Sequence, residues 1–259
     1  MSAIDTALGR FSSISLAGAN DVAELQTRVD RKYIVDEATL CDLLGALDPA
    51  MRVLEIDGAR SCDYHSTYFD TEDFALYRAA IQGRRRRYKV RCRAYGAAGP
   101  CFLEVKAKGS RGVNVKTRIG CDRGDLESIT LQGHDFIDST TSVSGLASTL
   151  MPVLTTQYSR STLIDAVSCT RLTFDRNLRC SDPARGDAVL DGFVVETKSA
   201  RAPSAVDQWL WSHHVRPVKL SKFGTGLAAT RPELPANKWH RLIARHWHTQ
   251  PALRSAVTW

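Results

Sequence analysis

Basic residues dominate one segment of the chain, GRRRRYKVRCRAYG at 83–96. If this segment is a strand, its side chains project alternately to two faces. One face would then be wholly cationic, with Arg85, Arg87, Lys89, Arg91 and Arg93. From Tyr88 onward the opposite face is apolar. A continuous row of cations at this spacing is suited to binding anions that carry several charges.

The electrostatic repulsion within this row of cations depends on whether the row is solvated or enclosed. Neighbours on one strand face are about 6.8 Å apart, so each cation pair costs roughly 0.6 kcal/mol in water and about 2.4 kcal/mol at an effective dielectric of 20. An enclosed row would cost about 10 kcal/mol, comparable to the stability of a domain. An antiparallel sheet with a solvated charged face shows the same alternation, but such a face usually mixes glutamate among its cations. The pattern therefore favours a cavity that holds phosphates.

Other predicted strands repeat the division. In CFLEVKAK (101–108) and VNVKTRIG (113–120), apolar residues alternate with charged ones. RVDRKY (28–33) places Arg28, Asp30 and Lys32 on a single face, and FVVETKS (193–199) places Glu196 and Lys198 on a single face. The cations that these and later strands add are Arg28, Lys32, Lys106, Lys108, Lys116, Arg118, Arg160, Arg171, Lys198 and Lys222.

Two acids stand among these cations. Glu104 and Glu196 each precede a lysine by two residues. A carboxylate in a phosphate site can bind Mg²⁺ or Mn²⁺, which then bridges phosphate oxygens. The alternative is a salt bridge with a neighbouring cation.

The elements that would position these residues are mostly short strands. Alternating runs at 28–35, 53–57, 64–70, 84–95, 101–108, 113–119, 158–164, 169–176, 188–199 and 215–222 predict about eight or nine strands. Asp36 and Pro203 mark helix starts, and a basic helix is expected over about 236–248. We expect a loosely specified leader over 1–23 and a single α+β domain over 24–259, built around an antiparallel barrel.

Composition limits the class of protein. The chain has 259 residues, 43% hydrophobic residues and a net charge of +7, which suits a globular domain with an anionic partner. No apolar run is long enough to span a membrane, and no signal peptide is apparent. The 7 cysteines form no CxxC pair, which favours a reducing cytoplasm over a disulfide framework or a zinc site.

The sequence resembles the VTC domain, the polyphosphate-polymerase branch of the triphosphate tunnel metalloenzymes (CYTH-like superfamily). The ordered motifs, within about 24–226, are RVDRKY (28–33), YFDT (68–71), YKVRCRAYG (88–96), FLEVKAK (102–108), KTR (116–118), YSR (158–160), RLTFD (171–175), VVETKS (194–199) and LSKFG (220–224). The resemblance implies an eight-stranded antiparallel β-barrel, a tunnel lined with basic residues and flanked by helices. It also implies that the tunnel holds ATP with a divalent metal and transfers the γ-phosphate to a polyphosphate chain.

The resemblance also implies roles for individual residues. The principal phosphate-binding, catalytic cations would be Lys32, Arg91, Arg93, Lys106, Arg171 and Lys222. Further phosphate contacts would come from Arg28, Lys89, Lys108, Lys116, Arg118, Arg160 and Lys198. Glu196 would be the main metal ligand and Glu104 a second, with Mn²⁺ or Mg²⁺ as the cofactor.

Two departures leave alternatives open. Hydrolases and cyclases of this superfamily carry Glu-x-Glu-x-Lys on the first strand, where this chain has Arg28, Asp30 and Lys32. Because fewer carboxylates are present to hold a metal, this departure weakens the interpretation as a hydrolase or cyclase. Eukaryotic polymerase subunits add an SPX domain and transmembrane helices, so a separate membrane partner is expected to supply such functions to a cytoplasmic or peripheral protein. An inorganic triphosphatase and a non-catalytic polyphosphate sensor remain the alternatives.

Nucleic acid is not the expected partner. The GRRRR run could bind nucleic acid, but it continues into an alternating strand without interleaved aromatic residues. The expected ligands are ATP and inorganic polyphosphate or tripolyphosphate. The histidines at 213–214 and 240–248 lie beside tryptophans, which favours packing or surface roles over metal binding.

Overall fold

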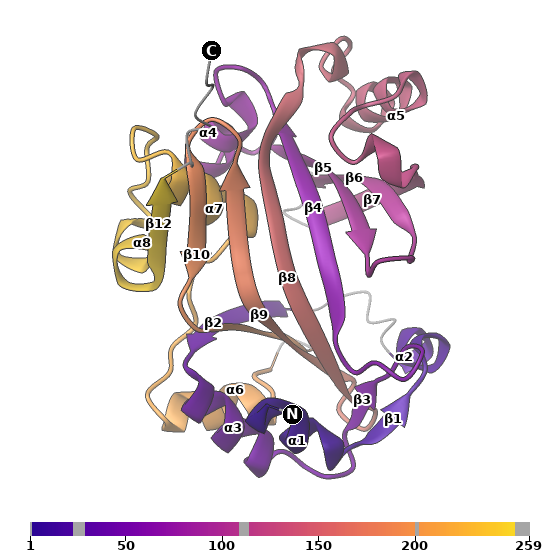
Figure 1. Ribbon diagram of the computed structural model, residues 1–259, viewed down its shortest axis with the longest axis vertical. Helices are drawn as coiled ribbons and strands as arrows, with labels where there is room; N and C mark the ends of the chain where they lie inside the picture. The colour runs from indigo at the N-terminus through magenta and orange to yellow at the C-terminus, as the bar shows by residue number, and fades with distance from the viewer. Residues whose placement is uncertain (1, 23–28, 109–113, 200–201, 252–259) are drawn as a thin grey trace, which may run out of the picture. The chain divides into compact units, whose positions relative to one another are not determined.

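Antiparallel strands form most of the protein, with helices on their faces (Figure 1). The computed structural model describes residues 2–22, 29–108, 114–199 and 202–251. Within these ranges there are eight α-helices: α1 (Ala3–Gly9), α2 (Leu16–Val22), α3 (Glu37–Ala46), α4 (Ala75–Ile81), α5 (Leu131–Thr141), α6 (Ala205–Ser212), α7 (Lys222–Thr230) and α8 (His240–His246). No helix among the described residues has the length and apolar character needed to cross a membrane. The predicted α+β class is confirmed.

The strands are β1 (Ser12–Ile14), β2 (Val29–Val35), β3 (Arg52–Leu54), β4 (Cys62–Asp70), β5 (Tyr88–Tyr95), β6 (Cys101–Lys108), β7 (Asn114–Gly120), β8 (Met151–Asp165), β9 (Thr170–Asp182), β10 (Gly186–Leu190), β11 (Phe193–Ser199) and β12 (Trp247–Pro251). Their hydrogen-bonded order is β12-β10-β9-β8-β4-β5-β6-β7, while β11 joins β9 to β2 and β3 joins β8 to β1. All paired strands whose register is described are antiparallel except β1 and β3.

The sheet differs from the eight-stranded barrel that the sequence predicted. It contains 12 strands, and among the described residues no pairing joins its ends into a closed ring. The strand predicted at 53–57 is present as β3, with only 3 residues, whereas β1, also of 3 residues, and β12, of 5, were not predicted. Such short strands have too few residues to show an alternating pattern, which explains why sequence periodicity did not predict them all.

The chain divides into two compact units, and the long strands β8 and β9 contribute to both. The first unit comprises 1–63, 158–178 and 190–219, and the second comprises 64–157, 179–189 and 220–259.

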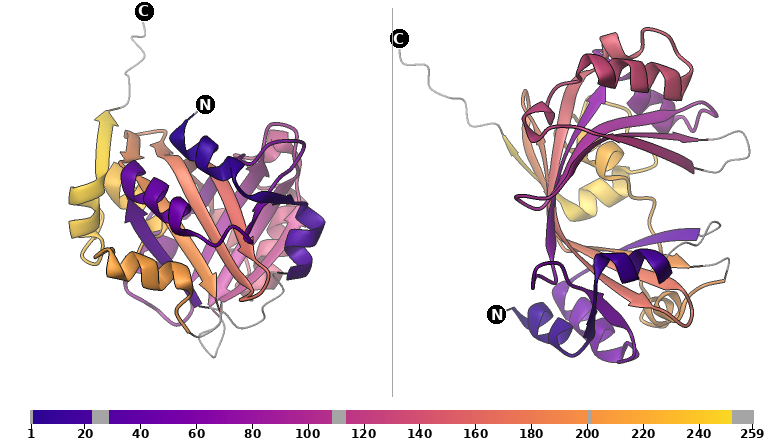
Figure 2. Two further views of the ribbon diagram at one scale, coloured as in Figure 1. Left: turned by 90° about the horizontal axis from the view of Figure 1, so that it is seen from below. Right: turned by 90° about the vertical axis from the view of Figure 1, so that its right-hand side faces the viewer.

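The core of the first unit lies between its strands and its helices. Tyr33, Leu172 and Val195 face this core from β2, β9 and β11, and α1, α3 and α6 cover them. Helices α1 and α3 lie side by side on the strands in Figure 2. Residues 3–22, expected to be a loosely specified leader, form α1, β1 and α2, and Ile4 and Leu8 are buried in this core.

The core of the second unit lies under α5. Val90, Cys92, Leu103 and Val105 from β5 and β6 pack with Ile137 of α5, and Figure 2 shows this helix across the strands. The side chains on the opposite face of these strands are therefore not part of this core.

Candidate phosphate-binding site

The strands β5, β6 and β7 place their charged residues on one face. Residues directly opposite each other in an antiparallel pair project to the same side of the sheet. Arg91 is opposite Glu104, which is opposite Arg118, and Lys89 is opposite Lys106, which is opposite Lys116. We call this surface the second charged face; its members are Lys89, Arg91, Arg93, Glu104, Lys106, Lys108, Lys116 and Arg118.

Glu104 is the acid at the centre of the second charged face. It is 2% exposed, and its carboxylate accepts hydrogen bonds from Arg91 Nε at 2.8 Å and Lys116 Nζ at 3.2 Å. Burial alone would raise the pKa of Glu104, but the charges of Arg91, Arg93 and Lys116 lower it to about 2. The salt bridge that the sequence left as the alternative for Glu104 is therefore present.

Arg93 is the most buried cation of this face. Its side chain donates from Nε to Ser66 Oγ at 2.9 Å and lies near the rings of Tyr64 and Tyr95, at 5.4 and 6.0 Å from their centroids. These contacts hold the guanidinium in one place, which suits a group that orients phosphate oxygens.

Tyr68 of β4 lies opposite Arg91, beside the second charged face, and the sequence did not single it out. Its hydroxyl accepts a hydrogen bond from Arg91 Nη1 at 3.0 Å, and its ring stacks on Phe223 with centroids 5.1 Å apart. Burial would raise the pKa of Tyr68, but Arg91, Arg93 and Lys222 lower it below its ordinary value. The same three cations would also stabilise a bound anion.

Lys222, which acts on Tyr68 together with Arg91 and Arg93, belongs to a helix rather than a strand. The sequence predicted a strand over 215–222, but Ser221 begins a helix: its Oγ accepts from Gly224 N–H at 3.1 Å and from Lys89 Nζ at 2.9 Å. The prediction of a strand here is wrong because the serine cap outweighs the short alternating run. Lys222 is therefore the first residue of α7.

The first unit has a charged face of its own. Glu196 of β11 lies opposite Lys32 of β2 and Thr173 of β9, and the next row places Lys198 opposite Asp30 and Arg171. We call this surface the first charged face; its members are Asp30, Lys32, Arg160, Arg171, Thr173, Asp175, Glu196 and Lys198.

Glu196 is the central acid of the first charged face. Glu196 is buried, and its Oε1 forms an ion pair with Lys198 Nζ at 2.9 Å. The same ammonium lies 3.8 Å from Asp30 Oδ2. Burial would raise the pKa of Glu196, but Lys32, Lys198 and Arg160 hold it well below its usual range. Glu196 is thus a carboxylate at neutral pH, as a metal ligand must be.

Arg160 and Arg171 are anchored differently. Arg160 donates to both oxygens of Asp175, from Nε at 2.5 Å and from Nη2 at 2.8 Å. Arg171 Nη2 donates to the carbonyl of Ala19 at 3.2 Å. Both guanidinium groups are held by the protein and still belong to the charged face.

Thr173 is a second residue that the sequence did not single out. It is buried at the row of Glu196 and Lys32, and its Oγ1 has no hydrogen-bond partner among the described residues. Buried hydroxyl groups usually have a partner, so Thr173 is suited to contact a ligand on this face.

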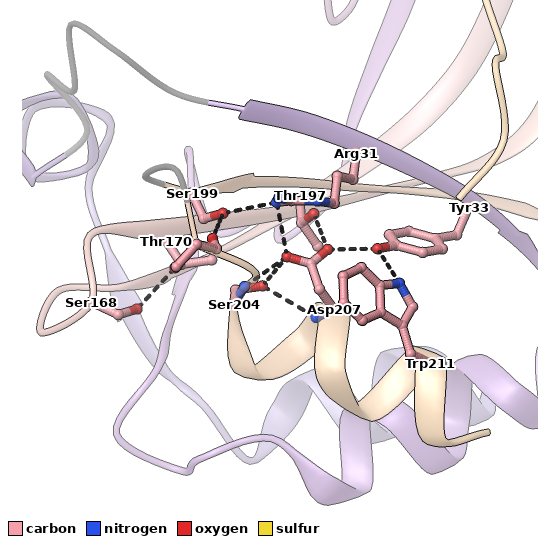
Figure 3. Close-up of polar contacts among 10 residues, drawn as sticks. Arg31, Tyr33, Ser168, Thr170, Thr197, Ser199, Ser204, Asp207 and Trp211 are labelled. Atoms are coloured by element: carbon pink, nitrogen blue, oxygen red, sulfur yellow. Dashed lines mark hydrogen bonds and ion pairs between the residues drawn. The ribbon is translucent and has the colours of Figure 1, made fainter. Parts of the chain in front are cut away.

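The opposite side of the same strands holds a polar cluster around Asp207 (Figure 3). Asp207 is fully buried and accepts hydrogen bonds from Tyr33 Oη at 2.7 Å and Thr197 Oγ1 at 2.6 Å. It also accepts from the backbone N–H of Ser204 at 2.7 Å and so closes a capping box at the start of α6. Burial would raise the pKa of Asp207, but these hydrogen bonds lower it. The cluster ties α6 to β2 and β11, which carry Lys32 and Glu196.

Several predicted residues are placed outside these faces. Arg28 lies outside the described residues. Arg84–Arg87 precede β5, which begins at Tyr88, so the predicted strand over 84–95 is too long and Arg85 is not part of the strand row. The expected helix over 236–248 is shorter, because α8 ends at His246 and Trp247 begins β12.

The acids differ in how well they suit a metal. Among the described residues no group of three or more His, Cys, Asp or Glu side chains is arranged to hold a metal ion. Mg²⁺ commonly uses one or two carboxylates together with substrate phosphates. Glu196 has a second carboxylate, Asp30, on the same face, and both pair with Lys198. Glu104 pairs with two cations, Arg91 and Lys116, and the second charged face has no further acid among its members. Glu196 therefore fits this pattern better.

Comparisons with known proteins agree with the motifs. The family model described as the VTC domain matches residues 27–231, more than half of the chain. No curated protein matches the chain.

The comparison with solved structures finds likenesses at low sequence identity. HpAC1 from Hippeastrum, described as an adenylyl cyclase candidate with a dominant triphosphatase activity, is 15% identical, with a TM-score of 0.50 over 77% of this chain and 94% of that chain. An adenylate cyclase candidate from Vibrio parahaemolyticus is 13% identical, with a TM-score of 0.42 over 76% and 95% of the two chains. The PH1819 protein from Pyrococcus horikoshii is 12% identical, with a TM-score of 0.47 over 80% and 99%. The likeness to HpAC1 concerns the fold alone.

Proposed function

Because the chain belongs to the VTC domain family, we propose that it is a polyphosphate polymerase that uses ATP. The observation that supports this most directly is that each unit has a sheet face crowded with cations around one ionised glutamate. Such faces suit a ligand with many negative charges and no fixed shape. We include in the proposal that each of the two faces binds phosphates.

The reaction needs no nucleophile from the protein. A terminal oxygen of the acceptor chain attacks the γ-phosphorus of ATP, a bond to that phosphorus forms, and the bond to the bridging oxygen of ADP breaks. Charge develops on the transferred group and on the leaving oxygen. Arg91, Arg93, Lys106, Arg171 and Lys222 would neutralise this charge and keep the three groups in line.

Glu196 would hold the divalent metal, with Asp30 as the nearest further carboxylate and Glu104 as a weaker candidate. When bound, Mn²⁺ or Mg²⁺ supplies further neutralisation of phosphate charge. Lys198 pairs with both Glu196 and Asp30, so it would have to change partners for either acid to bind a cation. A cytoplasmic location and a separate membrane partner belong to the same proposal.

One observation favours a triphosphatase as the second candidate. Asp30 lies on the same face as Glu196, on the strand where the tunnel hydrolases have their two glutamates, and thus offers a second carboxylate. HpAC1 is described as having a dominant triphosphatase activity. In a hydrolase, water would replace the acceptor chain and the product would be orthophosphate.

The test is incubation of the purified protein with ATP and Mn²⁺ or Mg²⁺, followed by phosphorus NMR and gel electrophoresis. We expect chains longer than three phosphates, and their loss in Glu196→Gln and Lys222→Ala. Lys219→Ala is the matched control, because Lys219 is exposed and lies on neither charged face.

The products decide among the candidates. Orthophosphate without polymer would establish the triphosphatase. Tripolyphosphate binding without turnover would indicate a sensor, and absence of binding to any triphosphate would overturn the proposal.

A further inference from the structure

A short arginine-rich loop, Gly83–Arg87, joins α4 to β5. Its backbone is well defined: Gly83 has a φ of +71°, and the N–H of Arg84 donates to the carbonyl of Ala79 at 3.0 Å. Arg87 Nη1 donates to the carbonyls of Gly83 at 3.2 Å and Arg84 at 2.6 Å. Arg87 therefore holds the loop in shape, and Arg84, Arg85 and Arg86 are left exposed.

The charges of these three arginines are not neutralised by the described protein. Arg85 and Arg86 have no hydrogen-bond or ion-pair partner among the described residues, and Arg84 Nε donates to the neutral amide of Gln82 at 2.8 Å. Between Asp73 and Glu104 the sequence contains no acidic residue. Like charges this close repel one another, so an anion bound to the loop would relieve the repulsion.

The backbone pairing of β5 with β6, which carry the second charged face, continues into the loop. The N–H of Lys108 donates to the carbonyl of Arg87 at 3.3 Å, one step beyond the pairing of Tyr88 with Ala107. From Arg93 to Arg87 the chain extends about 20 Å at the usual rise of a strand. A triphosphate is shorter than this row, so only a longer chain of phosphates would reach from the face to the loop.

The chemistry around the loop favours a phosphate chain over a nucleic acid. Single-stranded nucleic acids are usually bound by aromatic side chains that stack on the bases. The aromatic residue next to the loop, Tyr88, donates from its hydroxyl to the carbonyl of Thr141 at 2.9 Å and packs on the core cluster of the second unit. It is therefore not available for stacking.

We propose that Arg84, Arg85 and Arg86 bind the part of a polyphosphate chain that extends beyond the second charged face. The protein then binds long polyphosphate more tightly than tripolyphosphate. This inference rests on the proposed function, because it requires that the face itself binds phosphates.

The test compares the affinities of the full chain for tripolyphosphate and for polyphosphate of several tens of phosphates, by calorimetry at two salt concentrations. The variant is Arg84→Ala/Arg85→Ala/Arg86→Ala. Its control is Arg216→Ala/Arg241→Ala/Arg245→Ala, which removes the same charge from exposed positions elsewhere. From the usual strength of exposed ion pairs we expect the variant to lose about tenfold in affinity for the long chain. Its affinity for tripolyphosphate should stay close to that of the wild type, and the control should show little change in either.

The outcomes separate the two proposals. If the wild type binds tripolyphosphate and the long chain equally tightly, or the variant keeps its preference for the long chain, the inference about the loop is wrong and the proposed function stands. If the wild type binds neither, both are wrong. A single-stranded DNA of equal charge that binds as tightly as the long chain, with the same loss in the variant, would make the loop a nucleic-acid site and overturn the inference.

Discussion

Two cations of the second charged face differ in how deeply they are buried. Lys106 is exposed, whereas Arg93 is 8% exposed and bonds to Ser66. We expect Lys106→Ala to abolish phosphate binding and change the free energy of unfolding by less than about 0.5 kcal/mol, as is usual at exposed positions. Arg93→Ala should also abolish binding but cost about 2 kcal/mol, because a buried hydrogen bond and two ring contacts are lost.

Urea unfolding and tripolyphosphate titration of the same two variants measure this difference. Normal binding by Lys106→Ala would remove Lys106 from the site. A stability of Arg93→Ala equal to that of the wild type would show that relief of cation repulsion compensates for the lost contacts.

The alternation of residue types predicted the membership of both faces well. Glu104, Lys106 and Glu196 all lie where period two places them, because one side of each strand is covered by core. Alternation did not single out Tyr68 and Thr173. A tyrosine or threonine in a strand looks like an ordinary packing residue, and only the pairing of distant strands shows that each lies beside an acid or a cation.

The buried carboxylate of Asp207 connects helix α6 to β2 and β11. Asp207→Ala would leave Tyr33, Thr197 and the N–H of Ser204 without their acceptor. We expect a loss of about 3 kcal/mol or more in the free energy of unfolding, because several buried donors become unsatisfied at once. Denaturant unfolding monitored by tryptophan fluorescence measures this loss, since Trp211 donates to Tyr33 in the same cluster.

Asp36→Ala is the matched control for this element. Asp36 caps α3 through a hydrogen bond from Thr39 N–H at 2.8 Å, but it is exposed, so its removal should cost about 1 kcal/mol. Equal losses in the two variants would mean that Asp207 acts only as a helix cap and does not fasten the strands.

Local signals predicted some elements correctly and failed at others for physical reasons. Asp36 indicated the start of α3, and Pro203 indicated α6. The predicted helix over 236–248 is interrupted because Trp247 is buried as the first residue of β12. That exchange of helix for strand depends on contacts within the second unit, which a local pattern does not contain.

At the scale of the whole molecule, sequence periodicity predicts strands but not their order. The connection of β2 to β9 through β11, and of β1 to β8 through β3, joins segments that are far apart along the chain. Such pairs are selected by the burial of both faces rather than by any local residue pattern. The predicted antiparallel, helix-flanked architecture is therefore confirmed, whereas the number of strands and the closed barrel could not be read from alternation.

Each charged face should respond to bound phosphate within its own unit. We expect tripolyphosphate to slow amide hydrogen exchange in β5 and β6, which carry the second charged face, and in β2 and β11, which carry the first. At one hundred times the dissociation constant, the free energy of unfolding should rise by about 2.7 kcal/mol. Hydrogen exchange followed by mass spectrometry, with Lys106→Ala as the comparison, measures each unit separately. If the strands of a unit keep their exchange rates at saturating tripolyphosphate, the charged face of that unit does not bind it, because a bound polyanion must order the cations that hold it.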